Sequence, residues 1–209
     1  KKIKKMNFSN ITSKAYTTKE FAKLCLSNIS WSTLSYPCSK IYKKKFLDKY
    51  KIRLSKFHDG TFLLDALSKA NLIGYLNKPI VFYYDRKESI QRRYRPNMLE
   101  FINEVDNRLE KYLIANDAMD QNHKILLIDK RAGLIIATIL NHGLYGSFSQ
   151  FSMSLNKIKS SANFKNLYNK IRYLKNLKKK MFIFFLAKNY KLLLWIIINI
   201  YKFRLKLFL

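Results

Sequence analysis

Every acidic residue of the chain lies before position 130, and this asymmetry constrains its folding most. Residues 130–209 hold 16 Lys and Arg but neither Asp nor Glu. The whole chain of 209 residues has 41 Lys and Arg against 13 Asp and Glu, a formal net charge of +28. A compact state with this charge repels itself unless something anionic neutralises it. A solvated tail would also carry one sign of charge. Here, however, Phe, Tyr, Leu and Ile are interleaved with the cations, which favours a segment that orders on a polyanion.

Length and composition are compatible with one or two small domains that have a hydrophobic core. Hydrophobic residues make up 48% of the chain, enough for a packed interior. Nucleic acid is the first candidate for the neutralising partner, and an anionic membrane is the second. The cysteines, Cys25 and Cys38, form neither a CxxC nor a zinc pattern, so we expect reduced, apolar side chains. The opening KKIKK lacks the apolar region of a signal peptide, so secretion is not expected.

The periodicity of apolar residues predicts alternating helices and strands. Helical spacing is found in residues 19–28, 61–76 and 98–116. In the last of these, Glu104 and Arg108 form an i,i+4 pair, and in the second, Thr61 is a candidate N-cap. Runs of strand type occupy residues 77–85, 124–129 and 147–153. A turn at residues 131–133 and a short helix over 134–143, ended by Gly143, are expected between the last two.

This alternation is typical of an α/β (α+β) fold, and a long basic, partly helical C-terminal extension (154–209) follows it. A basic N-terminal arm (1–18) precedes the first helix.

The end of the extension is apolar but interrupted by charges. Residues 181–209 contain Lys188, Lys191, Lys202 and Arg204, and the longest uncharged run, 192–201, has ten residues. A bilayer span needs roughly 20 apolar residues. We therefore expect a helix that is buried or packed on a partner rather than a membrane span, while a helix on a membrane surface stays open.

No constellation of catalytic or metal-binding residues is evident. His58, His123 and His142 are far apart in sequence, and His58-Asp59-Gly60 is typical of a turn at a helix start. The five glycines form neither GxGxxG nor GxxxxGK[ST]. The sequence thus predicts a protein without enzymatic activity, metal, cofactor or small-molecule substrate.

An arginine-rich connection precedes Pro96. Arg92, Arg93 and Arg95 surround Tyr94. Arginine pairs bidentately with phosphate and stacks on bases, and tyrosine adds a stacking surface. This mixture is common in proteins that bind RNA, whereas a solvated turn is the alternative interpretation.

The order of motifs resembles the bacterial-type small-ribosomal-subunit protein eight family. ESIQRRYRP (88–96) resembles that family's ESIQR..RPG. FAKLC…SN (21–28) and LLDALSKANLI (63–73) resemble its first two helices, and PCSKI (37–41) resembles its PSSKL. ILLIDKRAG (125–133) resembles its IxxVSTSKG strand and loop, and NHGLYGSFSQF (141–151) its xxGLGGExxxY. Together the blocks cover about residues 19–153.

The resemblance implies a fold of two small packed α/β domains, an N-terminal α/β domain (19–78) and a C-terminal α/β RNA-binding domain (79–153). It also implies that the protein binds the central domain of small-subunit rRNA and helps to assemble the subunit platform. Asp129 to Gly133 stand where the family has STSKG, so Lys130 and Arg131 would contact phosphate in place of the hydroxyls. The implied RNA-binding residues are Ser39, Lys40, Arg92, Arg93, Tyr94, Arg95, Lys130, Arg131 and Gly133. Ser39 would reach a 2′-hydroxyl or a phosphate, and the cations would straddle the RNA minor groove.

The extension beyond the family's usual end suggests a mitochondrial version in the matrix, with rRNA and neighbouring ribosomal proteins as partners. The alternative is a basic accessory subunit of a mitochondrial inner-membrane complex, anchored by residues 181–209.

Overall fold

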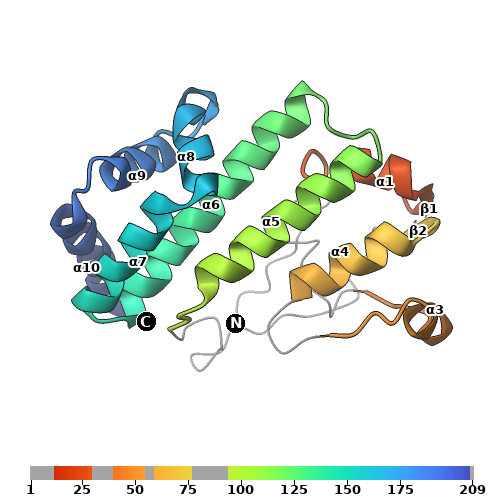
Figure 1. Cartoon of the computed structure of the whole chain (residues 1–209), viewed down its shortest axis with the longest axis horizontal. Coiled ribbons are helices and arrows are strands. Elements are labelled where there is room, and N and C mark those ends of the chain that lie inside the picture. Colours follow the sequence, from red (N-terminus) through yellow and green to blue (C-terminus); the bar gives the residue numbers. More distant parts are fainter. Residues whose placement is uncertain (1–11, 30–39, 55–58, 77–93, 208–209) are drawn as a thin grey trace. The chain divides into compact units, whose positions relative to one another are not determined.

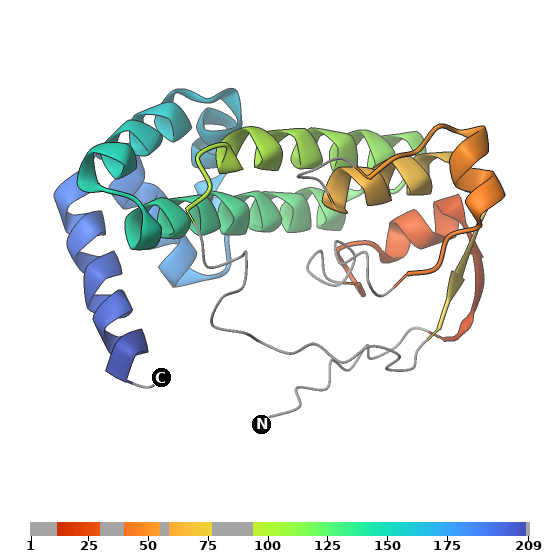
Figure 2. The same cartoon turned by 90° about the horizontal axis from the view of Figure 1, so that it is seen from below.

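Helices dominate the structure, a computed structural model that describes residues 12–29, 40–54, 59–76 and 94–207. Within these ranges the strands are β1 (Lys14–Thr17) and β2 (Leu72–Tyr75). They pair antiparallel, with Tyr16 opposite Ile73, and lie side by side in Figure 2. All other elements are helical (Figure 1).

The prediction of two packed α/β domains is wrong. Residues 124–129, predicted as a strand, and 131–133, predicted as a turn, lie inside the 25-residue helix α6 (Gln121–Tyr145). Residues 147–153, predicted as an edge strand, begin helix α7 (Phe148–Ser160). The observed strands lie where an arm and the end of a helix were expected. The predicted strand at 77–85 falls outside the described residues.

The physical reason is that one helical pattern of apolar residues runs through several short segments, each of which resembles a strand or a turn when it is considered alone. Leu127, Ile128, Ala132, Ile135 and Ile139 are all buried, and their spacing is that of one helix face. Residues 121–145 contain no proline to interrupt it. A six-residue apolar run cannot by itself be distinguished from a turn and a half of buried helix.

The chain forms two compact units. The first comprises Lys1–Tyr84 and Glu104–Leu127, and the second comprises Asp85–Asn103 and Ile128–Leu209. Helices α5 (Met98–Ala115) and α6 therefore contribute residues to both. The predicted helix at 98–116 is confirmed, and Arg108 Nη2 lies 2.7 Å from Glu104 Oε1, as the i,i+4 spacing predicts.

The first unit packs α1 (Thr18–Leu24), α3 (Lys44–Lys49), α4 (Asp59–Lys69), the two strands and parts of α5 and α6. Thr17 and Glu20 form a capping box that starts α1. Tyr112 of α5 donates its hydroxyl hydrogen to the Thr18 carbonyl at 3.2 Å. Thr61 is buried inside α4 and does not cap it. Burial raises the pKa of the Cys25 thiol to about 12, and Cys38 lies outside the described residues.

The second unit is a helical array built around the C-terminal part of α6. It contains α7, α8 (Ala162–Asn169), a 3-10 turn η3 (Ile171–Tyr173), α9 (Leu177–Ala187) and α10 (Lys191–Leu207) (Figure 1). Its buried core joins all four α-helices to α6 through side chains that include Ile139, Phe151, Leu167, Ile183 and Ile198. No helix of the described residues is both long and apolar enough to cross a bilayer.

Gly143 brings α6 and α10 close together rather than ending a helix. It lies inside α6, and a Cβ placed on it would be 2.8 Å from Ile198 Cδ1 and 3.3 Å from the Phe151 ring. Such an approach forces neighbours to move, which costs about 1–3 kcal/mol in a packed core. Glycine is thus required here by close packing.

We expect Gly143→Ala to destabilise the protein by about 1 kcal/mol, because overpacking outweighs the better helix propensity of alanine. Ile198→Val removes the Cδ1 atom that the new methyl group meets. Urea unfolding should show that the double variant is more stable than the sum of the single effects predicts. Strict additivity would contradict this account of Gly143.

Candidate nucleic-acid interface

The end of the arginine-rich connection is fixed to α6 in the second unit. The Arg95 amide donates a hydrogen bond to Asn141 Oδ1 at 2.9 Å, and the Met98 amide donates one to the Arg95 carbonyl at 3.3 Å. The Tyr94 ring meets the His142 ring edge-on, with 5.0 Å between centroids. A Cβ on Gly146 would lie 2.6 Å from the His142 carbonyl oxygen and 3.2 Å from the Tyr94 ring. Glycine at this position therefore allows Tyr94 to lie against the end of α6.

His142 is buried without a hydrogen bond to either ring nitrogen among the described residues. Burial lowers the pKa of its imidazole, the Glu100 carboxylate raises it, Lys157 lowers it, and the net shift is downward. His142 is therefore a neutral ring in the folded state that packs on Tyr94.

The lowered pKa predicts a loss of stability in acid. The unfolded imidazole, with a pKa of about 6.5, takes up a proton that the folded one does not, so stability falls as the pH drops below about 6.5. We expect His142→Phe to flatten this part of the stability profile while keeping the aromatic contact. Urea unfolding at about pH 5.5 and about pH 7.5 measures it; an unchanged difference between the two conditions would refute the role of His142.

The predicted Asp129–Gly133 loop is the middle of α6. Lys179 of α9 places its Nζ 2.6 Å from Asp129 Oδ2 and 3.2 Å from the Asp129 carbonyl oxygen. Arg131 is only 5% exposed, so its guanidinium is not displayed to a ligand. Lys130 is half-buried, and Gly133 packs near Lys179 with a helical backbone. Of these residues, Asp129 and Gly133 lie beside α9, where both are close to Lys179.

The predicted RNA-binding residues are therefore not all gathered in one place. Lys130 and His142, against which Tyr94 packs, are twelve residues apart on α6, or about 18 Å at 1.5 Å per residue. Tyr94 and Arg95 are half-exposed. Lys40 belongs to the first unit and is half-exposed. Ser39, Arg92 and Arg93 lie outside the described residues, and their role remains a prediction.

A larger set of exposed cations lies on α7, α8, η3 and the segment that follows. We call it the basic surface; its members are Lys157, Lys165, Lys170, Arg172 and Lys175. The guanidinium of Arg172 lies 4.9 Å from the Tyr173 ring centroid and donates to the Tyr173 hydroxyl at 3.0 Å. The sequence indicated the charge of this stretch and its interleaved aromatic residues, but none of these five residues was predicted as a site residue. Composition alone does not distinguish the exposed cations from half-buried ones such as Lys159 and Lys179.

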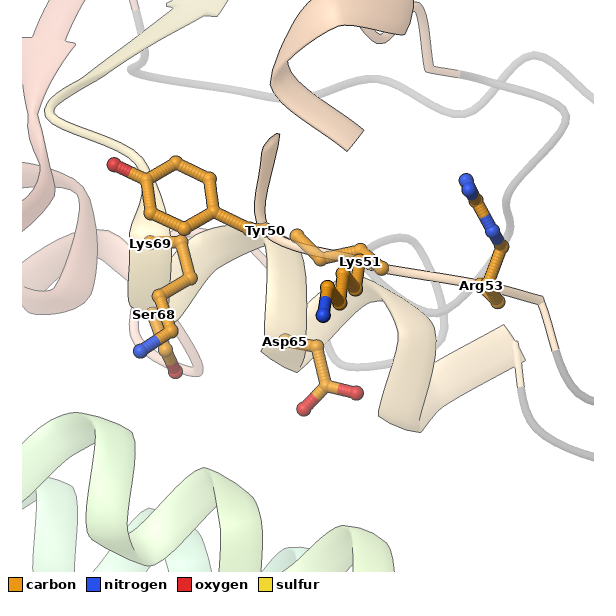
Figure 3. A pocket seen from close by; sticks show the side chains of 7 residues that line it. Tyr50, Lys51, Arg53, Asp65, Ser68 and Lys69 are labelled. Carbon is orange, nitrogen blue, oxygen red and sulfur yellow. The ribbon is translucent and has the colours of Figure 1, made fainter. Parts of the chain in front are cut away.

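A shallow polar pocket of about 390 Å³ lies in the first unit (Figure 3). Asp65, Ser68 and Lys69 come from α4, and Tyr50, Lys51, Ile52 and Arg53 come from the segment after α3. Small-molecule sites are mostly apolar and concave, and this lining is mainly polar and charged. Asp65 also pairs with Arg108, and Arg53 pairs with Asp48 at 2.9 Å. Within the described ranges no three His, Cys, Asp or Glu side chains gather as a metal site.

Comparison with known proteins gives one partial similarity. No family model matches the chain, and no solved structure matches it. Protein IN2-1 of Zea mays is 34% identical over 85 residues. The match covers 40% of this chain and 32% of the maize protein, so the chain spans about a third of that relative's length. This match does not assign the chain to a family.

Proposed function

We propose that this protein is a structural constituent of the mitochondrial small ribosomal subunit that binds the central domain of small-subunit rRNA and aids platform assembly. The observation that carries RNA binding is the basic surface. Its five cations are exposed, one of them, Arg172, lies against the Tyr173 ring, and residues 130–209 contain no acid. Exposed Lys and Arg bind phosphate, and Tyr173 with Arg172 offers a surface on which a base stacks.

The arginine-rich connection would supply the second contact. The Arg95 amide donates a hydrogen bond to Asn141 Oδ1, and the Tyr94 ring packs against the His142 ring. Binding through residues that are already held in place costs less entropy than ordering a free arm, and Tyr94 and Arg95 are held in this way. In this proposal Arg92, Arg93 and Arg95 bind rRNA phosphates, and the buried Arg131 does not contact RNA.

The ribosomal setting rests on the order of the sequence motifs. The α/β fold that the resemblance implies is not the observed fold, so RNA binding is argued from charge and exposure instead. Neighbouring ribosomal proteins remain the proposed protein partners, and no catalytic step is part of the proposal.

The proposal is tested first by binding of an rRNA central-domain fragment at several salt concentrations. The logarithm of the binding constant should fall linearly with the logarithm of salt concentration, with a slope near −0.9 per phosphate contact on a duplex and about −0.7 on a single strand. A slope near zero would overturn RNA binding. A DNA duplex of equal length is the control, since equal affinity for it would leave polyanion binding but remove rRNA recognition.

The ribosomal assignment has its own test. In a gradient of mitochondrial lysate, the protein should sediment with small-subunit rRNA and shift to lighter fractions after ribonuclease treatment. Sedimentation that resists ribonuclease and collapses in detergent would favour the alternative, an accessory subunit of an inner-membrane complex.

A further inference from the structure

Helix α10 is apolar on the face turned to solvent as well as on the face turned to the core. Leu194 and Ile198 are fully buried. Leu192, Ile196 and Ile200, which follow one another at intervals of four residues, are 63%, 46% and 55% exposed. Residues at this interval form one stripe along a helix. The stripe has no covering element among the described residues.

Helix α9 repeats the arrangement. Its Ile183 and Leu186 are buried, while Leu177, Met181 and Phe184 are 69%, 47% and 42% exposed. Their spacing of four and three residues again places them along one side of a helix. Large exposed apolar groups gathered on adjacent elements mark an interaction surface rather than ordinary scatter.

Cations accompany these stripes, and acids do not. Lys178 and Lys188 are exposed on and just after α9, and Lys188 Nζ lies 6.0 Å from the Phe184 ring centroid. Long basic side chains can extend from an apolar surface to an anionic headgroup layer.

We propose that α9 and α10 bind the surface of an anionic lipid bilayer, lying in the plane of the headgroups with their exposed stripes inserted among the upper acyl chains. Helices that bind this way combine an apolar face with a lysine-rich border and reach about 5–10 Å into the bilayer. The proposal concerns a surface different from the basic surface assigned to RNA and does not depend on it.

Charge and side-chain type favour lipid over other occupants. A second copy of this surface would bring like charges together in a region without acids, which opposes self-association. RNA would satisfy the lysines but not the aliphatic stripe, because bases stack on aromatic rings and arginine planes. An anionic bilayer matches both components.

The test is co-sedimentation of the full chain with phosphatidylcholine vesicles that contain phosphatidylserine, with pure phosphatidylcholine vesicles as reference. The stripe variant replaces Leu192, Ile196 and Ile200 with Gln; its control replaces Leu54, Leu72 and Ile114, which are 59%, 67% and 58% exposed in the first unit. We expect the parent to prefer anionic vesicles, the stripe variant to bind at least about tenfold more weakly, and the control to match the parent. Because every replaced side chain is exposed, all three proteins should have the same circular dichroism spectrum.

Three results would overturn the proposal. Equal binding by the stripe variant and the parent would mean that charge alone attracts the protein to lipid. Equal binding to neutral and anionic vesicles would show that the lysines do not contribute to binding. The double variant Lys178→Gln and Lys188→Gln tests the contribution of these two lysines directly. Stripe-dependent self-association without vesicle binding would identify a protein–protein surface instead.

Discussion

Phe151→Ala should lower the free energy of unfolding by about 3–5 kcal/mol, the usual effect of deleting a fully buried phenyl ring. Phe151 on α7 has no exposed surface. Its ring lies 5.1 Å from the Trp195 ring of α10 and 6.5 Å from the Phe148 ring, between centroids. It also comes within 3.3 Å of the Cβ position of Gly143 on α6. Residues of α6, α7 and α10 meet at this ring, so its removal leaves a cavity between these three helices.

Thermal and urea unfolding measure the effect. For a unit of this size, 3–5 kcal/mol corresponds to a fall of at least about 12 °C in Tm. Met153→Ala is the matched control, since Met153 lies on the same helix and is 56% exposed; it should change stability by less than about 0.5 kcal/mol. Equal Tm values for the two variants would refute the packing of α10 on α7.

The sequence predicts α5 well because its pattern runs unbroken over many turns. Ile102, Val105, Leu109 and Leu113 recur at the spacing of one helix face in the sequence, and all four are buried. The helix predicted over residues 134–143 lies within α6, but residues 124–133 and 147–153 were misassigned because each short apolar segment was considered alone. The signal that favours a helix at 147 is local: Ser147 and Gln150 form a capping box, with the Ser147 amide donating to Gln150 Oε1 at 2.8 Å.

Because the middle of α6 was predicted as a loop, Arg131 was included among the candidate RNA-binding residues. Arg131 follows Ile128 by three residues and precedes Ile135 by four, so in a helix it lies on the buried face with both. A correct helical assignment would therefore have predicted its burial. As part of a loop it was predicted to bind phosphate. The Asp129–Lys179 contact joins residues 50 apart, and no local pattern predicts such a pair.

The exposed stripe of α10 could not be predicted from sequence. Residues 192–198 are apolar without exception, and a helix that is apolar all round does not reveal which side faces the core. The buried side is selected by tertiary contacts, here by the approach of Ile198 to Gly143. The remaining apolar side chains are then left in solvent.

Replacing Lys165, Lys170 and Arg172 with Gln should weaken binding of the rRNA fragment on the order of 100-fold at low salt. Each lost phosphate contact removes about 1 kcal/mol. These side chains are exposed on α8 and η3, so the fold should not change. The slope of log affinity against log salt should fall in magnitude by about 2–3, because three counterions fewer are released.

Charge-matched variants decide whether position matters or only net charge. The control variant replaces Lys43, Lys44 and Lys45, which are exposed at the start of α3 in the first unit, with Gln. It loses the same charge and should bind RNA with nearly full affinity. The triple variant of Arg92, Arg93 and Arg95 should weaken binding as the α8–η3 variant does, since both sets are proposed to contact rRNA. If all three variants lose affinity equally, binding follows the net charge of +28 and no defined interface exists. If only the variant of Arg92, Arg93 and Arg95 loses affinity, the arginine-rich connection alone binds the RNA. The exposed cations of α8 and η3 would then bind another anionic partner.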